Sequence, residues 1–328
     1  MNRLLDNLCQ MIVPVDPGVL AEYQHRIDQL TKPKGSLGRL EEITSGHGAI
    51  RHPQVASPKR KYTFTFAADH GISRSGVSLY PREVTAQMVC NFLSGGAAIS
   101  VMCRHYGIEN MVVDVGVDHD FKPHRRLVSR KVGYGTRNLL EEAAMTWEQA
   151  KEYVRVGADL ADEYAKHGAD LVGTGDMGIG DTTASSAIFA AVTGLEPQEV
   201  TGKGTGIDGA RLRSKVALIR RALDLHRADG SDPLEVLARV GGFEIGAILG
   251  LILGCASKRV PVVVDGFIST AGAVLAILAC PLVKDFLFFS HRSREKGHRV
   301  ILDGLGAKPL FNLDLSLGEG SGAVMLWI

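Results

Sequence analysis

The chain has 328 residues, which suits one large domain with a smaller attachment, because single hydrophobic cores stop growing near about 250 to 300 residues. It carries 37 lysines and arginines against 36 aspartates and glutamates, and the formal charge of +1 supplies no global field for nucleic acid or an anionic membrane. The five cysteines lie far apart without a CxxC pair, which argues against a disulfide framework and against a cysteine-bound metal. A site for a small molecule is therefore expected, without metal.

Residues 1–58 are predicted to form a small helical domain around the loop TKPKGSLGRLEEI (31–43), packed beside the rest of the chain. The N-terminus lacks a basic start with a long apolar run and a cleavage signal, so we expect a cytoplasmic protein. The apolar stretch GAILGLILGCA (246–256) is shorter than the roughly 20 residues that span a bilayer. No membrane segment is expected.

Residues 59–328 alternate short apolar runs with helical patterns, which predicts a Rossmann-like α/β catalytic domain. Buried parallel strands are predicted over 61–69, 111–117, 169–175, 260–267 and 286–291. Helices are predicted over 81–107, 146–168, 209–227 and 269–281. The fold class is therefore an open, doubly wound, mainly parallel α/β sheet with helices on both faces. Ligands bind beyond the carboxyl ends of such strands, so one rim should carry Asp69, His70, Asp114 to Asp118, the glycine loop after residue 175, Asp265 and His291.

The loop LVGTGDMGIGDTTASSA (171–187) has two interpretations. Its Gly173, Gly175 and Gly178 match the GxGxxG spacing of dinucleotide sites, but the acids about 20 residues later lie in GLEPQEV, which Pro197 interrupts. Repeated glycines before a helix also suit a single phosphate, because backbone N–H groups can approach it. We favour the phosphate, bound by Gly178, Gly180, Thr182 and Thr183.

Two later stretches leave alternatives open. VTGKGTGIDGARLRSKV (200–216) offers backbone donors with Lys203 and Lys215, or is a flexible loop before a solvated basic helix. VPVVVDGFISTAG (260–272) partly resembles the pyrophosphate loop of the common phosphoribosyltransferases, but it lacks the second acid and the Thr-Gly-Gly of that loop. Its Asp265 either bonds a ribose hydroxyl or caps the following turn.

The last stretch, NLDLSLGEGSGAVMLWI, places Glu319 between two glycines in an apolar surround without a local cation. Partial burial would raise the pKa of this carboxyl and make it a usable proton acceptor. The alternative is an exposed turn acid near a helix start, where acids are favoured in any case.

Nine segments together resemble successive motifs of the nicotinate-nucleotide:dimethylbenzimidazole phosphoribosyltransferase family, in the family's order and over nearly the whole chain. They are KPKGSLGRLE (32–41), AADHGI (67–72), YPREVTAQMV (80–89), GDMGIGDTTASSA (175–187), TGKGTGIDGARLRSKV (201–216), VGGFEIGAILG (240–250), VVVDGFIST (262–270), SHRSREKGH (290–298) and LGEGSGAV (317–324).

The resemblance implies transfer of 5-phosphoribosyl from nicotinate mononucleotide to a lower-ligand base of a cobamide, with inversion at the anomeric carbon and without a cofactor. It implies Glu319 and Asp176 as catalytic residues. It assigns the phosphate and ribose to Gly178, Gly180, Asp181, Thr182, Thr183, Gly204, Lys215 and Ser290, and the aromatic base to Tyr80, Gln87, Met88, Met177 and Leu317. It also implies a homodimer, in which the small domain of one subunit closes the site of the other.

Three departures from the family's motifs are expected to matter. Asp176 stands where the family usually has Glu, and Asp181 where it has Asn. The family continues past LGEGSGA into a C-terminal helix of the small domain, whereas this sequence stops at Ile328, so we expect either a truncated chain or an incomplete small domain. Some members act on phenolic bases and pair two related chains, so a regulatory subunit of a heterodimer is one alternative. A nicotinamide oxidoreductase, resting on the GxGxxG spacing alone, is the other.

Overall fold

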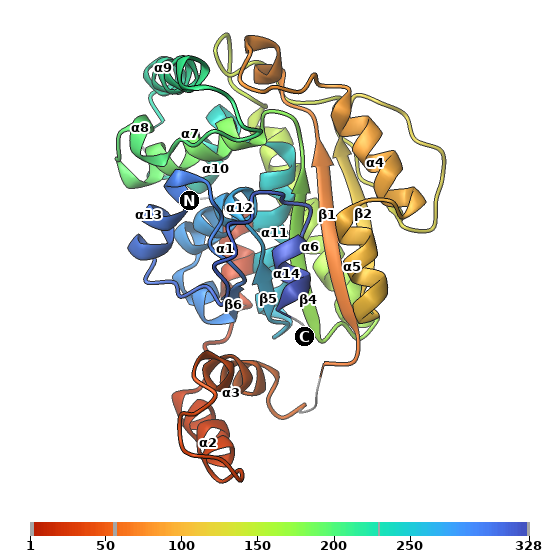
Figure 1. Ribbon diagram of the computed structural model, residues 1–328, viewed down its shortest axis with the longest axis vertical. Helices are drawn as coiled ribbons and strands as arrows, with labels where there is room; N and C mark the ends of the chain where they lie inside the picture. The colour runs from red at the N-terminus through yellow and green to blue at the C-terminus, as the bar shows by residue number, and fades with distance from the viewer. Residues whose placement is uncertain (1–2, 55–57, 229, 327–328) are drawn as a thin grey trace.

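The computed structural model describes residues 3–54, 58–228 and 230–326, and its centre is a six-stranded parallel sheet in the order β3-β2-β1-β4-β5-β6 (Figure 1). The strands are β1 (Lys61–Ala68), β2 (Glu109–Gly116), β3 (Leu127–Ser129), β4 (Leu171–Met177), β5 (Val262–Val264) and β6 (Leu287–Phe289). The chain runs outward from β1 in one direction and from β4 in the other, so the strand order reverses between these two strands. Ligands bind at such reversal points beyond the carboxyl ends.

The predicted fold class is confirmed, and the five predicted strands correspond to β1, β2, β4, β5 and β6. β3 was not predicted, because it has only three residues and none of them is buried. The single helix expected over 81–107 is two helices, α4 (Val84–Ser94) and α5 (Ala98–Tyr106). They are separated at Gly95, whose φ of +86° ends α4 in a left-handed cap.

Helices cover both faces of the sheet. One face is packed by α6 (Trp147–Lys166), α7 (Asp181–Thr193), α10 (Pro233–Val240), α11 (Phe243–Ser257) and α12 (Phe267–Ala279), and the other by α4, α5 and the short α14 (Ser321–Met325). The helices of residues 59–326 that are not yet named are α8 (Pro197–Val200), α9 (Gly209–His226) and α13 (Lys296–Gly304), and the 3-10 turns are η1 (Gly71–Ser75) and η2 (Pro281–Phe286).

The apolar stretch 246–256 belongs to α11, which is buried over residues 243–256 against α6 and the sheet. A Cβ at Gly157 of α6 would lie 1.9 Å from the carbonyl oxygen of Ala247, and one at Gly250 would lie 1.9 Å from that of Val154. Glycine is therefore required at both positions, because the two helix backbones touch there. The stretch therefore belongs to a buried core helix that contacts α6 closely through glycines.

The N-terminal region contributes α1 (Arg3–Gln10), α2 (Pro17–Asp28) and α3 (Arg39–Arg51), of which α2 and α3 project from the body as a hairpin below β6 (Figure 1). Glu41 is buried inside the hairpin and accepts from Lys32 Nζ at 2.8 Å and from the N–H of Leu37 at 3.0 Å, which holds the predicted loop. By contrast α1 packs on α11, and α14 near the chain end packs on α5 and β4. The division into 1–58 and 59–328 stays a prediction.

One described stretch, Val84–Tyr106, is long and apolar enough to satisfy a length-and-hydropathy test for a membrane span. In the fold it is broken between α4 and α5, and both helices lie against the sheet. Such a test is also passed by core helices of proteins without membrane segments.

Candidate active site

A cavity of about 140 Å³ lies at the carboxyl ends of β4 and β5, next to the point where the strand order reverses. Its walls come from the loop after β4, from the Gly204 loop, from the start of α12 and from the segments around His291 and Leu317. Eight of the residues predicted from the sequence line it: Asp176, Met177, Gly178, Gly180, Asp181, Thr182, Gly204 and Leu317. Segments more than 100 residues apart therefore meet in one place.

The loop between β4 and α7 has the geometry of an anion site. Gly180 adopts φ +113° before the first turn of α7, and a Cβ at Gly178 would lie 2.5 Å from the carbonyl oxygen of Ala68. Both positions therefore require glycine, and the helix start supplies a favourable dipole, whereas the N–H groups of Asp181, Thr182 and Thr183 already donate within the loop. Thr182 lines the cavity, whereas Thr183 is fully buried and its hydroxyl has no hydrogen-bond partner among the described residues.

Lys215 of α9 lies behind this loop and is almost fully buried. Its Nζ donates to Thr182 Oγ1 at 2.9 Å, and burial lowers its pKa although Glu295 and Asp181 act in the opposite direction. Glu295 lines the cavity and accepts from the N–H of Gly204 at 2.8 Å. Glu295 was not predicted as a site residue, because nothing local in SHRSREKGH indicates a contact with a loop 91 residues away.

The Glu319 turn crosses the face of the sheet above Gly175 and is conformationally strained. Gly318, Glu319 and Gly320 all have positive φ, at +78°, +67° and +96°, and such a conformation is costly for a residue with a side chain. The N–H of Glu319 donates to the carbonyl oxygen of Asp176 at 3.2 Å, and Thr65 Oγ1 donates to the carbonyl oxygen of Glu319 at 2.9 Å. Contacts from β4 and β1 thus hold the strained residue.

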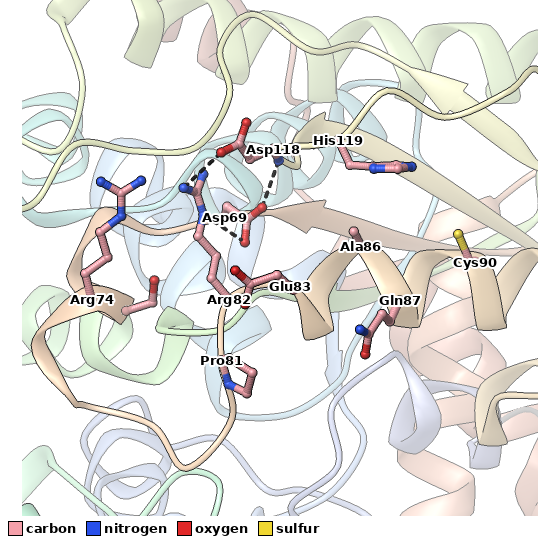
Figure 2. A pocket seen from close by; sticks show the side chains of 11 residues that line it. Asp69, Arg74, Pro81, Arg82, Glu83, Ala86, Gln87, Cys90, Asp118 and His119 are labelled. Carbon is pink, nitrogen blue, oxygen red and sulfur yellow. Dashed lines mark hydrogen bonds and ion pairs between the residues drawn. The ribbon is translucent and has the colours of Figure 1, made fainter.

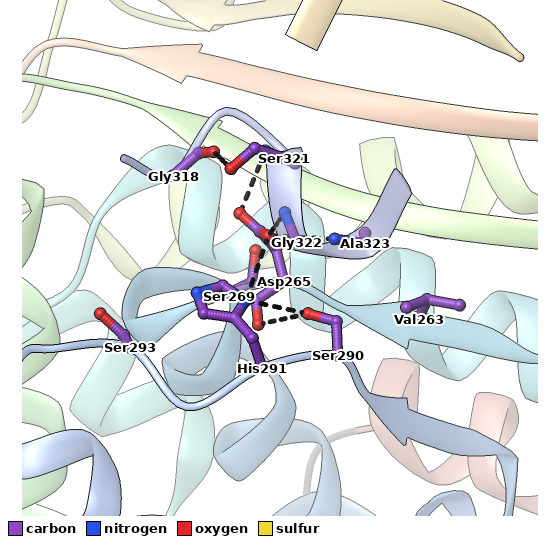
Figure 3. Close-up of polar contacts among 12 residues, drawn as sticks. Val263, Asp265, Ser269, Ser290, His291, Ser293, Gly318, Ser321, Gly322 and Ala323 are labelled. Atoms are coloured by element: carbon purple, nitrogen blue, oxygen red, sulfur yellow. Dashed lines mark hydrogen bonds and ion pairs between the residues drawn. The ribbon is translucent and has the colours of Figure 1, made fainter. Parts of the chain in front are cut away.

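Asp265 holds the other side of the same turn (Figure 3). Its Oδ2 accepts from the N–H of Gly320 at 3.0 Å, and its Oδ1 accepts from the N–H groups of Gly322 at 2.7 Å and Ala323 at 3.1 Å. Asp265 therefore caps the start of α14 and not, as considered from the sequence, the turn that follows it. Burial raises the pKa of this carboxyl to about 7, although the three N–H groups lower it.

Ser290 belongs to this support and does not line the cavity. Its Oγ donates to the carbonyl oxygen of Asp265 at 3.1 Å and lies 3.1 Å from His291 Nδ1, and the residue is fully buried. The neighbouring His291 and Ser293 line the cavity instead.

The carboxylate of Glu319 is 4% exposed and points to the first turn of α5, where its Oε2 accepts from the N–H of Ile99 at 3.3 Å. Burial raises its pKa, and no described cation pairs with it. This is the environment of a proton acceptor rather than of an exposed turn acid. In this conformation the carboxylate does not line the cavity, although Leu317 and Gly318 do.

Asp176 lies on the cavity wall and is also buried, at 4% exposure. Ser269 Oγ donates to its Oδ1 at 3.5 Å. Burial first, and then the charges of Asp181 and Asp265, raise the pKa of Asp176 well above its usual value.

The five residues assigned to the aromatic base are not gathered in one cavity. Met177 and Leu317 line the 140 Å³ cavity, Met88 packs in the same apolar cluster as Met177, and Tyr80 is 54% exposed. Gln87 lines a second, larger cavity of about 860 Å³ beside α4.

The second cavity opens beyond β1 and β2 and is crossed by a polar cluster (Figure 2). Arg82 Nη1 lies 3.0 Å from Asp118 Oδ2, and Arg82 Nε lies 3.4 Å from Asp69 Oδ1. The N–H of Asp118 donates to Asp69 Oδ2 at 2.8 Å. Arg82 is therefore engaged in joining the ends of two strands.

Replacing Gly175 by Ala is expected to displace the Glu319 turn. The added Cβ would lie 2.4 Å from the carbonyl oxygen of Glu319 and 2.6 Å from the N–H nitrogen of Gly320, both backbone atoms. Overpacking of this kind costs about 1–3 kcal/mol of stability, and we expect a lower Tm with a lower kcat. Gly304→Ala is the matched control, because a Cβ there would meet no atom within 4 Å. Equal behaviour of the two variants would contradict the packing argument.

Gly175 also explains the GxGxxG spacing. Gly173 and Gly175 lie within β4 rather than in a loop, and Gly175 makes room for the Glu319 turn. The spacing therefore reflects packing on a strand face and does not require a dinucleotide.

Comparison with known proteins agrees with this geometry. A family model described as Phosphoribosyltransferase (DBI_PRT) matches residues 12–328. The chain is similar to nicotinate-nucleotide–dimethylbenzimidazole phosphoribosyltransferases of Geobacter sp. strain M21, with 52% identity over 98% of this chain and 93% of the relative, and of Geobacter sulfurreducens, with 53% identity over 98% and 92%. It is also similar to the crystal structure of CobT from Thermus thermophilus, with a TM-score of 0.90 and 46% identity over 95% of this chain and 93% of that one. The chain belongs to the nicotinate-nucleotide–dimethylbenzimidazole phosphoribosyltransferase family.

Proposed function

We propose that this protein transfers the 5-phosphoribosyl group from nicotinate mononucleotide to 5,6-dimethylbenzimidazole or a related benzimidazole or phenol. The products are an α-ribosyl 5-phosphate and nicotinate, a step in building the nucleotide loop of cobamides. The observation that carries the proposal is the strained Glu319 turn, which packs on β4 just before the glycine-rich loop and bears a buried carboxylate without a described cation partner. The names of the relatives support the same substrates.

The reaction needs a base but little acid. Nicotinate mononucleotide carries a pyridinium at its glycosidic bond, so the electron pair of the breaking C–N bond neutralises the ring nitrogen as nicotinate leaves. The incoming base attacks the anomeric carbon from the opposite face and inverts it from β to α. Its N–H or O–H proton passes to Glu319, which exchanges its contact with the N–H of Ile99 for the incoming base.

The phosphate loop contributes by positioning. The phosphate binds at Gly178, Gly180, Asp181 and Thr182 with Gly204, and Lys215 acts from behind through Thr182. Thr183 and Ser290 support the walls from buried positions. Because the nucleotide is held at both ends, its translational and rotational freedom is given up when it binds. Little further freedom has to be lost to reach the reactive geometry.

Asp176 is proposed to act at the wall of the base site, where it lies with Met177, Leu317 and Gly318. Asp176→Glu adds one methylene to this wall. A methylene in a pocket changes discrimination by about 10- to 200-fold, so the ratio of kcat/KM for a benzimidazole against a phenol is expected to shift by at least the lower figure. Both bases are assayed with wild type and variant. Unchanged base preference and turnover would remove Asp176 from the specificity wall.

We also propose a cytoplasmic homodimer, with a heterodimer of two related chains as the alternative. The α2–α3 hairpin supports assembly, because Leu20, Leu30, Leu37 and Leu40 are exposed on a segment that projects from the body. Light scattering of the purified chain distinguishes a dimer from a monomer that requires a paralogue.

The direct test is a release assay. Purified protein is given nicotinate mononucleotide and a panel of benzimidazoles and phenols, and nicotinate release is followed with a chelator present. Release that depends on the added base, with formation of an α-ribosyl phosphate, is the expected result. No release with any base from a folded dimer would contradict the proposal.

A further inference from the structure

A fully buried histidine and glutamate form a pair beneath the phosphate loop, and the mechanism above does not use them. His70 follows β1 and Glu244 lies in the first turn of α11, and both have 0% exposure. His70 Nε2 lies 3.0 Å from Glu244 Oε1. A buried pair of this kind is costly to desolvate, so its presence calls for an account beyond packing.

The imidazole touches the underside of the loop. A Cβ at Gly178 would lie 3.3 Å from both Cδ2 and Nε2 of His70, and one at Gly180 would lie 3.0 Å from its Cβ. On the far side, a Cβ at Gly242 would lie 2.3 Å from Glu244 Oε1 and 2.6 Å from His70 Cε1. Three glycines thus make room for the pair, and no side chain separates the ring from Gly178 and Gly180.

The described surface of the cavity supplies no lysine or arginine for a phosphate. Among its described lining residues there are three acids, Asp176, Asp181 and Glu295, and neither a lysine nor an arginine. A phosphate monoester in this place requires positive charge from behind the wall. The two groups in that position are Lys215, which reaches Thr182, and His70.

The surroundings of His70 favour its charged form. Burial lowers its pKa, but Glu244 from α11, Asp181 from α7 and Asp69 at the end of β1 raise it, and the net shift is upward. The ring meets the position of Gly178 through Cδ2 and Nε2, and the same Nε2 pairs with Glu244 Oε1, which lies against Gly242. In a medium of low dielectric such an oriented pair acts strongly over a short distance.

We propose that His70, held as an imidazolium by Glu244, is a positioning residue for the phosphate of the nucleotide, acting from beneath the loop through Gly178 and Gly180. This inference rests on the proposed function for the identity of the nucleotide. The binding of a phosphate monoester at this loop can be tested without turnover.

The test uses Glu244→Gln, which keeps the shape of the side chain and removes its charge. Because this change removes the negative charge 3.0 Å from His70 Nε2, the Kd for nicotinate mononucleotide is expected to rise about tenfold or more. The Kd for nicotinate riboside, which lacks the phosphate, should stay unchanged. Glu244→Asp, which retains the charge, is expected to restore most of the affinity. Calorimetry or thermal-shift titration supplies these values, with inorganic phosphate as a second probe.

The control is His226→Gln. His226 is also a buried histidine, but it lies on α9, and its Nε2 is 2.7 Å from the carbonyl oxygen of Leu139. This variant should bind both ligands as wild type does. Equal losses of nucleotide and riboside affinity in Glu244→Gln would reduce His70 and Glu244 to a structural role and overturn the proposal.

The charge of His70 is measured directly by ¹⁵N NMR of its imidazole. Both ring nitrogens are expected to carry protons near neutral pH in wild type, and one is expected to lose its proton in Glu244→Gln. A neutral His70 in the wild-type protein overturns the proposal. Failure of the nicotinate-release assay with retained, Glu244-dependent binding of inorganic phosphate would contradict the proposed reaction and leave this inference standing.

The pH dependence in wild type gives a further check. Phosphate affinity should fall as the pH rises through the raised pKa of His70. Asp181 loses its proton in the same direction, since burial raises its pKa to about 7. Asp181→Asn removes that second contribution, and a fall in affinity that persists in this variant belongs to His70.

Discussion

Glu319→Gln is expected to lower kcat for nicotinate release by about 10²- to 10⁴-fold, the range contributed by a general base. Glutamine keeps the size of the side chain and its ability to accept from the N–H of Ile99, so the turn should survive. KM for nicotinate mononucleotide should change little, because the phosphate loop is untouched. Glu152→Gln, at a half-buried glutamate of α6 that pairs with Arg155 away from the cavity, is the control and should retain full activity.

The same carboxyl sets an expected pH profile. Glu319 must be unprotonated to accept a proton, and burial raises its pKa above the ordinary 4.5. In wild type, kcat should therefore fall as the pH is lowered through that raised value, with the midpoint above 4.5. The acidic limb should vanish from the residual activity of Glu319→Gln. A limb with the same midpoint in both proteins would assign the titration to another group.

Asp265→Asn is expected to release the Glu319 turn and to lower both kcat and Tm. Asparagine can accept with only one side-chain atom, so at least one N–H among Gly320, Gly322 and Ala323 loses its partner. A buried donor without a partner costs about 1–3 kcal/mol, and the strained φ of Glu319 has less to hold it. We expect kcat to fall about tenfold or more.

The matched control for Asp265→Asn is Asp303→Asn on α13, where the aspartate is exposed and pairs with Arg299. This variant should leave kcat and Tm unchanged. If Asp265→Asn kept full kcat while losing stability, the cap would matter for folding alone and not for the placement of Glu319.

The sheet could be predicted from the sequence because its buried strands are continuous apolar runs, whose pattern is local. β3 could not be predicted, because its three residues are not buried and show no such apolar pattern. The position of the site could also be predicted. In a parallel sheet the carboxyl ends of all strands lie at one edge, whatever the connections between the strands. This is why Asp176, Gly178 and His291 meet at one cavity.

Contacts between distant segments could not be read in the same way. Glu295 pairs with the Gly204 loop, and Glu244 with His70, across 91 and 174 positions, and neither pairing leaves a local signal. The role of Asp265 depended on where the Glu319 turn crosses the sheet, which is a tertiary fact. Ser290 was expected at the phosphate, but the direction of its side chain is fixed by the carbonyl oxygen of Asp265.

The position of Gly175 has a consequence for how the family can change its substrates. β4 carries the Glu319 turn on its face at Gly175 and the anion loop at its end from Gly178. Three positions of extended strand span about 10 Å, so one short piece of backbone fixes the separation between the turn of the proposed proton acceptor and the proposed phosphate loop. Residues of the surrounding walls can be substituted to fit an acceptor with a different aromatic ring, and this distance stays the same. We therefore expect the reaction at the anomeric carbon to be preserved when the acceptor base changes.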